Sequence, residues 1–175
     1  MANTYTLIAS NTLGSSAASV TFSAIPNTYT DLVLKFSARA NSGGSTAGDV
    51  YARLNSSSSA IYSETVLRCY ESNTPASLRQ NIESSFIYLT QQNGSATTSN
   101  TFSNFEVYIP SYTASQNKPI SSFGVLENNN ATTPFIGVDA GLFRSTSAIT
   151  SITLNIGNDA FASGSSFFLY GIKNS

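Results

Sequence analysis

Alternation of apolar and polar residues runs through almost the whole chain and limits its fold more than any other feature. From Leu32 to Ala38 every second residue is apolar, and the residues between them include Lys35 and Ser37. Successive side chains of a strand point to opposite faces, so this pattern predicts a strand with one wet face. Clusters of Ser, Gly, Asn and Pro end each such segment, as turns do. We expect strands over residues 5–10, 19–25, 31–39, 50–54, 61–70, 85–90, 105–109, 120–127, 135–143, 149–156 and 166–172.

Helical periodicity is nearly absent. One short helical turn is expected over residues 75–81, where Asn73 or Thr74 can cap the turn and Pro75 fits its first position. Short strands at near-regular spacing, without helices for parallel crossovers, predict antiparallel sheets packed face to face. We therefore expect an all-β, antiparallel β-sandwich that is jelly-roll-like, with about ten strands and at most one short helical turn.

The length of the chain suits one domain. At 175 residues, 41% of them hydrophobic, it can fill one core, and β-sandwiches commonly reach this size undivided. The polar tracts at residues 42–48 and 95–100 are too short to link domains, so we interpret them as exposed loop tips. We predict a single β-sandwich domain over residues 1–175.

Charged residues are scarce, at 10% of the chain, and the net charge is -1. Such a chain has no basic surface for a phosphate backbone, so we expect no nucleic-acid partner. No stretch approaches the roughly 18 consecutive apolar residues of a membrane span. The opening, Met1 to Ser10, has no basic region followed by an apolar run, so we expect neither a signal peptide nor a membrane anchor.

The chain has no histidine, which excludes the usual His-dependent triads and the pairing of Cys69 with an imidazole base. No Ser-Lys pair stands at catalytic spacing. A pair of carboxylates for glycoside hydrolysis is formally open, but the chain has no Trp to form a sugar platform, and its Phe and Tyr fit a core. We expect no enzyme and no catalytic residues. The acids concerned are Glu64, Glu71, Glu83, Glu106 and Glu127.

Metal-binding patterns are also missing. One cysteine and scattered acids cannot build a usual zinc site, and Cys69 lies in an alternating stretch where a buried thiol is expected. The loops at 128–130 and 157–159 offer oxygen ligands without the alternating acidic spacing of a calcium loop, so a turn-forming role is favoured. We predict no metal and no cofactor.

Several segments resemble structural proteins from phages of cyanobacteria and other aquatic bacteria. They are YTLIA at 5–9, FSAIPNTYTDL at 22–32, YIP at 108–110, the block 122–144, GLFRSTSAITSITL at 141–154 and FASGSSFFLYGIK at 161–173. These motifs combine apolar strand residues with polar turns. The resemblance implies a virion protein, either a capsid cement (decoration) protein or a fibre or tail protein, and it brings no family active site with it.

Between these two, we favour capsid cement, because the chain has no repeat, no coiled-coil heptads and no spare length for a shaft. The resemblance then implies a homotrimer on the exterior of the capsid, bound to the major capsid protein and made in the cytoplasm of the bacterial host. The alternative is a fibre or tail protein with a receptor-binding or glycan-binding β-sandwich head. An enzyme acting on host polysaccharide is a third possibility.

Aromatic residues suggest where a trimer interface lies. Phe167 and Phe168 are consecutive and must point to opposite faces of a sheet, so one of them needs a cover beyond its own sheet. A second sheet of the same chain or a neighbouring copy can supply that cover. We name Phe135, Phe143 and Phe168 as the candidate oligomer interface.

Overall fold

A computed structural model of the chain describes residues 4–41, 44–70, 75–128, 134–157 and 159–173. These residues form strands and connecting turns, and no helix occurs among them. The strands are β1 (Tyr5–Thr12), β2 (Ser19–Phe22), β3 (Asp31–Ala38), β4 (Ala47–Leu54), β5 (Tyr62–Tyr70), β6 (Ala76–Ser84), β7 (Ile87–Asn93), β8 (Ser103–Ile109), β9 (Lys118–Leu126), β10 (Phe135–Phe143), β11 (Ile152–Ile156) and β12 (Ser166–Ile172).

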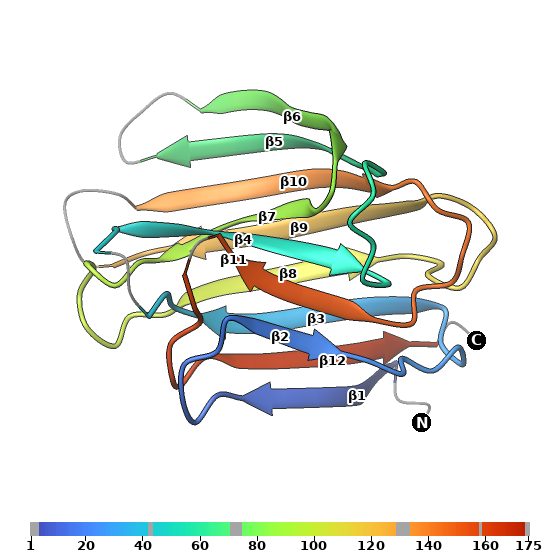
Figure 1. The fold of residues 1–175 in the computed structure, drawn as a ribbon, viewed down its shortest axis with the longest axis horizontal. Helices are drawn as coiled ribbons and strands as arrows, with labels where there is room; N and C mark the ends of the chain where they lie inside the picture. The colour runs from blue at the N-terminus through green and yellow to red at the C-terminus, as the bar shows by residue number, and fades with distance from the viewer. Residues whose placement is uncertain (1–3, 42–43, 71–74, 129–133, 158, 174–175) are drawn as a thin grey trace.

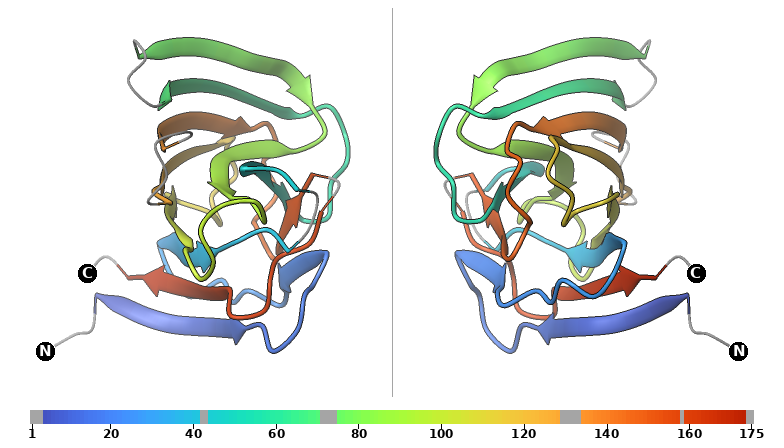
Figure 2. Two further views of the ribbon diagram at one scale, coloured as in Figure 1. Left: turned by 90° about the vertical axis from the view of Figure 1, so that its left-hand side faces the viewer. Right: turned by 90° about the vertical axis from the view of Figure 1, so that its right-hand side faces the viewer.

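The strands form two antiparallel sheets that pack face to face, as the alternation predicts (Figures 1 and 2). The larger sheet has eight strands in the order β1-β12-β3-β8-β9-β10-β5-β6, and the smaller has four in the order β2-β11-β4-β7. The smaller sheet covers only the middle of the larger one, so β5 and β6 extend past its edge (Figure 2). The prediction of an all-β antiparallel sandwich is confirmed, and its outer faces differ greatly in width.

The helical turn predicted over residues 75–81 is wrong, because most of this segment belongs to β6. Residues 76–80 pair with β5 in an antiparallel register that places Leu78 opposite Val66. The local capping pattern before Pro75 is therefore outweighed by pairing with a neighbouring strand. Other predicted strands match observed ones within a few residues, although the segment 149–156 is a strand only from Ile152.

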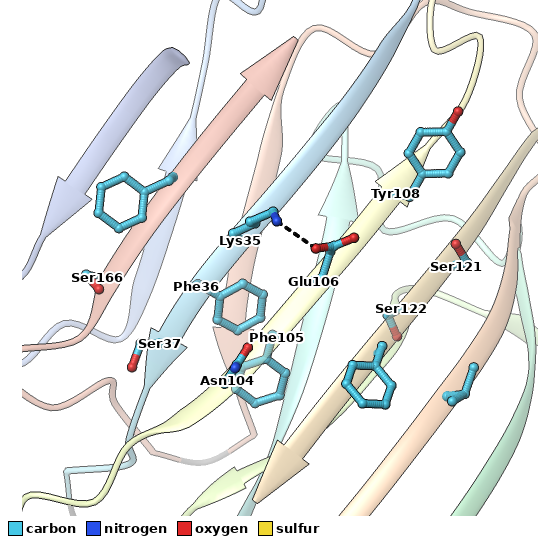
Figure 3. A pocket seen from close by; sticks show the side chains of 13 residues that line it. Lys35, Phe36, Ser37, Asn104, Phe105, Glu106, Tyr108, Ser121, Ser122 and Ser166 are labelled. Carbon is cyan, nitrogen blue, oxygen red and sulfur yellow. Dashed lines mark ion pairs between the residues drawn. The ribbon is translucent and has the colours of Figure 1, made fainter. Parts of the chain in front are cut away.

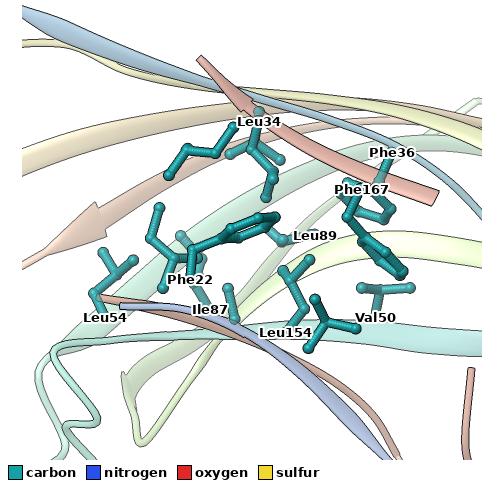
Figure 4. Packing of buried hydrophobic residues seen from close by; sticks show 14 of the residues in the cluster. Phe22, Leu34, Phe36, Val50, Leu54, Ile87, Leu89, Leu154 and Phe167 are labelled. Carbon is teal, nitrogen blue, oxygen red and sulfur yellow. The ribbon is translucent and has the colours of Figure 1, made fainter. Parts of the chain in front are cut away.

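Alternating side chains from both sheets form one hydrophobic core between them (Figure 4). The larger sheet supplies an aromatic stack in which the ring centroid of Phe36 lies 4.4 Å from that of Phe105 and 5.5 Å from that of Phe167. The smaller sheet faces it with aliphatic residues such as Leu54 and Leu154. Complete burial of these side chains, at about 1.5–3 kcal/mol each, favours the sandwich over either sheet alone.

The edge strand of the smaller sheet, β7, sits unusually close to the larger sheet, over β9 and β10. Gly124 and Gly137 are opposite each other in the β9–β10 pair. A Cβ atom at Gly124 would lie 2.3 Å from Thr90 Cγ2, and one at Gly137 would lie 2.7 Å from Thr90 Oγ1. Thr90 itself has φ of 99°, at a register irregularity between β4 and β7. Glycine is thus required on the larger sheet where β7 approaches.

Candidate binding groove on the larger sheet

The outer face of the larger sheet carries a continuous row of side chains that crosses its strands. The strand registers place Phe168 of β12 opposite Lys35 of β3, and Lys35 opposite Glu106 of β8. Glu106 in turn lies opposite Phe123 of β9. We call these four side chains the groove row. Two aromatic side chains therefore bracket a pair of opposite charges on neighbouring strands.

Lys35 and Glu106 form an ion pair in the middle of this row, with Nζ 2.9 Å from Oε2 (Figure 3). Their side chains are 50% and 51% exposed, so both still present polar atoms to solvent. The hydrogen bond with Glu106 raises the pKa of Lys35 above its ordinary value. Because the pair is solvated, it contributes little to stability. Its arrangement is better suited to contacts with a ligand than to holding the fold.

Polar side chains flank the groove row on both sides (Figure 3). On one side Ser166, Ser37 and Asn104 lie in register across β12, β3 and β8. On the other side Tyr108 lies opposite Ser121. Together with the groove row they line an open groove of about 860 Å³, within the usual size range of small-molecule sites.

Tyr108 is held in place at one end of the groove. Its hydroxyl donates a hydrogen bond to Asp31 Oδ2 at 2.9 Å, and this bond is the main cause of the raised pKa of Tyr108. Asp31 Oδ1 also accepts a hydrogen bond from the backbone N–H of Ser111 at 2.8 Å. The carboxylate thus fixes the position of the phenol ring that lines the groove.

An apolar patch lies beside the groove, over β5, β9 and β10. Val138 is opposite Leu67, and Ile136 is opposite Val125. Leu67 is 53% exposed, Ile136 46% and Val138 44%, while Val125 is half-buried. We define these four residues as the apolar patch. Neighbouring strands lie about 4.8 Å apart, so the centre of the patch is roughly 10 Å from Glu106.

The predicted interface aromatics are only partly where the sequence analysis expects them. Phe143 is 1% exposed and stacks on Tyr62 at a centroid distance of 5.2 Å. Phe135 is 4% exposed and packs edge-on against Tyr70. Both rings point inward and the single chain covers them, so neither is exposed for contact with a neighbouring copy. Phe168 is half-buried on the outer face, while Phe167 is fully buried, as their consecutive positions require.

Among the candidate acids whose side chains the structure describes, none share a site. Glu64 and Glu106 point to opposite faces of the larger sheet: Glu64 is buried and accepts a hydrogen bond from the backbone N–H of Tyr88 at 2.6 Å. Glu127 is exposed beyond the end of β9. Glu71 and the side chain of Glu83 lie outside the described residues. The prediction that the chain is not an enzyme stays a prediction.

No group of three potential metal-ligating Cys, Asp or Glu side chains occurs in the described part of the chain. Most of the Asn-rich loop at 128–130, and Asn158 of the loop at 157–159, lie outside that part. Cys69 is half-buried rather than buried, because it points to the outer face opposite Ile136. The described residues also contain no helix long and apolar enough to cross a membrane.

A buried polar cluster between the sheets is absent from the sequence-based predictions. Asp139 is 2% exposed, and its Oδ2 accepts a hydrogen bond from the Ser122 hydroxyl at 2.7 Å. Burial raises the pKa of Asp139 to about 6, although the Ser122 hydrogen bond acts against this shift. Gln92 and Thr90 of β7 are also fully buried. Phe135, Gly137 and Asp139 are alternate residues of β10 and therefore share one face of the strand. Once Phe135 is known to face the core, the sequence places Asp139 there too.

Comparisons with known proteins give only distant likenesses. No family model and no curated protein matches the chain. Among solved structures, the galectin LEC-6 of Caenorhabditis elegans is 8% identical with a TM-score of 0.35, over 94% of this chain and 96% of that one. Scytalido-glutamic peptidase is 10% identical with a TM-score of 0.30, and the match covers 91% of this chain and only 66% of the peptidase.

A third similar structure is the CBM2 module of the evolved Dit protein of Lactobacillus casei BL23 phage J-1. It is 11% identical with a TM-score of 0.27, and the match covers 90% of this chain and 69% of that one. At these values none of the three likenesses carries a function to this chain.

Proposed function

We propose that the chain is a structural protein of a phage particle, a capsid cement protein that binds the outside of the assembled shell. The observation that carries this proposal is the apolar patch, which a single chain leaves uncovered. The resemblance of the sequence to phage structural proteins is the reason for proposing a phage particle as the binding partner. The major capsid protein is the proposed partner, and the homotrimer implied by the resemblance stays a prediction.

The patch is suited to protein contact because its side chains are neighbours on three adjacent strands, β5, β10 and β9. Leu67 and Val138 form one cross-strand pair, and Val125 and Ile136 form the next. Complete burial of such a side chain contributes about 1.5–3 kcal/mol, and about half of each exposed one is already covered, so docking gains on the order of 1 kcal/mol each. Glu127 lines the same hollow as Val125 and Ile136, so docking over the patch must leave this carboxylate in solvent or replace its lost hydration.

The second candidate is a fibre or tail protein with a receptor-binding or glycan-binding head. The groove beside the patch is the specific observation that favours it, because polar and aromatic side chains line it together. The two candidates differ in copy number. A cement protein is present at a number comparable with that of the major capsid protein, whereas a fibre or tail part is present in far fewer copies. A mass-spectrometric inventory of purified particles measures this ratio.

Shell binding tests the patch directly. Particles that lack the chain are incubated with purified protein, and the bound amount is measured after sedimentation. We expect Ile136→Asp to lower occupancy by about tenfold or more, because an aspartate in a buried contact is strongly unfavourable. The matched control is Leu7→Asp, since Leu7 is similarly exposed, at 51%, on β1 near the opposite edge of the same sheet.

The control variant is expected to bind like the unmodified chain. Equal occupancy by the Ile136→Asp and unmodified chains would contradict the assignment of the patch. Failure of the unmodified chain to bind shells at all would contradict the cement function. Circular dichroism of each variant shows whether it retains the β-rich fold.

A further inference from the structure

The groove row offers a binding surface next to the apolar patch, and the two share one border: Val138 of the patch lines the groove and lies opposite Phe123. The charged centre of the groove row lies on β3 and β8, whereas the patch centres on β5 and β10. We propose that this groove is a binding site for an uncharged oligosaccharide, which lies across the strands between Phe168 and Phe123. The site goes beyond the cement function, and it is tested on the isolated chain.

The two aromatic side chains set the ends of the site. Phe168 and Phe123 are separated by three strand spacings, or about 14 Å, which gives room for a short chain of sugar rings. Phe123 is 44% exposed and Phe168 is half-buried, so both present ring surface to the groove. A sugar ring has an apolar C–H face, and aromatic side chains bury such faces well. The ends of the groove therefore suit two ring contacts.

The charges in the groove favour a neutral ligand. Lys35 and Glu106 are the only charged residues that line it, and each neutralises the other. A carboxylate, sulfate or phosphate on the ligand would approach Glu106 wherever it approached Lys35. The Lys35 ammonium has N–H donors beyond the one in the ion pair, and the Glu106 carboxylate has further lone pairs that can accept hydrogen bonds. The pair thus offers donors and acceptors side by side, as vicinal hydroxyl groups require.

The flanking residues complete this chemistry. Asn104 supplies both a donor and an acceptor, and the hydroxyls of Ser37 and Ser121 can each act either way. These side chains are short, so they line the groove without filling it. Because the side chains on both sides are uncharged and versatile, the groove has the few convergent polar groups that fix a small ligand.

A peptide is a poorer occupant of this site than a glycan. The strands β3, β8 and β9 are central and pair with a neighbour on both sides. Their backbone groups are engaged in the sheet, so an extended peptide cannot add to them as it does to a sheet edge. Recognition at the groove must come from side chains, and these are arranged across the strands.

The test is binding of defined sugars to the purified chain. The probes are an array of uncharged tri- to pentasaccharides and the same backbones carrying sulfate or uronate groups, followed by calorimetry on the best uncharged probe. We expect uncharged probes to bind and their acidic counterparts to bind more weakly. Phe168→Ala should weaken binding of the best probe by about tenfold or more, through loss of a ring contact.

Two further variants make the result specific. Tyr5→Ala is the matched control, because Tyr5 is an exposed aromatic residue on β1 of the same sheet but does not line the groove, and it should bind like the unmodified chain. Lys35→Met should also weaken binding, whereas a role in folding alone would change only the melting temperature. Failure of every uncharged probe to bind, tighter binding of acidic probes, or equal weakening by Tyr5→Ala would overturn the proposal. Shell occupancy is a separate readout, so either proposal can fail alone.

Discussion

The carboxyl group of Asp139 lies between the sheets, and its surroundings explain why sequence patterns miss it. Alternation assigns residues of β10 to two faces but does not state which face is inside. Ile136 and Val138 on one face look as apolar as Phe135 and Phe143 on the other. The structure buries the face that carries Phe135, Gly137 and Asp139 and exposes the aliphatic one. Gly137 and Gly141 of that face decide the matter, because a Cβ atom there would lie 2.7 Å from Thr90 Oγ1 or 2.0 Å from Ile87 Cδ1, both in β7.

Replacement of Asp139 by Asn tests the effect of burying this acid. Burial raises its pKa from 3.8 to about 6, so the folded state binds the proton more tightly than the unfolded state. The stability from this group is then full below pH 4 and is lost as the pH rises through 6. We expect Asp139→Asn to raise the free energy of unfolding by about 1–3 kcal/mol at pH 8 and to change it little at pH 4. Urea denaturation at both pH values measures this, and equal gains at both would contradict it.

The strand β6 shows how an element escapes prediction while its neighbours do not. Within residues 76–84 the large apolar residues are Leu78 and Ile82, four positions apart, a spacing that fits a helix as well as a strand. β9 and β10 each carry five inward positions at every second residue, and so long a run fits only the period of two. β6 is an edge strand that pairs with β5 alone. Its own sequence therefore shows little of the apolar–polar alternation that identifies a strand.

The approach of β7 to the larger sheet gives a prediction about one glycine. A methyl group at Gly124 would lie 2.3 Å from Thr90 Cγ2 and 2.8 Å from Phe105 Cδ1, and both neighbours are buried. We expect Gly124→Ala to lower the free energy of unfolding by about 1–3 kcal/mol through overpacking. Gly14→Ala is the control, because nothing lies within 4 Å of its added Cβ. Similar denaturation midpoints for the two variants would contradict the close packing of β7.

For the molecule as a whole, the sequence predicts the class of fold but not the groove. Lys35 is predicted to face away from Leu34 and Phe36, and it does. Its partners Glu106 and Phe168 are distant in the sequence, and only the strand order brings them beside it. Alternation defines strands and faces, while pairing between distant strands depends on the packing of both sheets together. The groove is thus a property of the strand order.

The heat resistance of the particle tests the cement function of the whole molecule. A protein that binds only the assembled shell stabilises it by an amount that grows with the affinity and the free concentration. Particles that lack the chain should therefore assemble but release DNA at a lower temperature than complete particles, as followed with a DNA-binding dye during heating. Addition of the unmodified chain should restore the release temperature, and addition of Ile136→Asp should not. Identical release temperatures with and without the chain would contradict the cement function, because bound copies that add no stability to the shell are not cement.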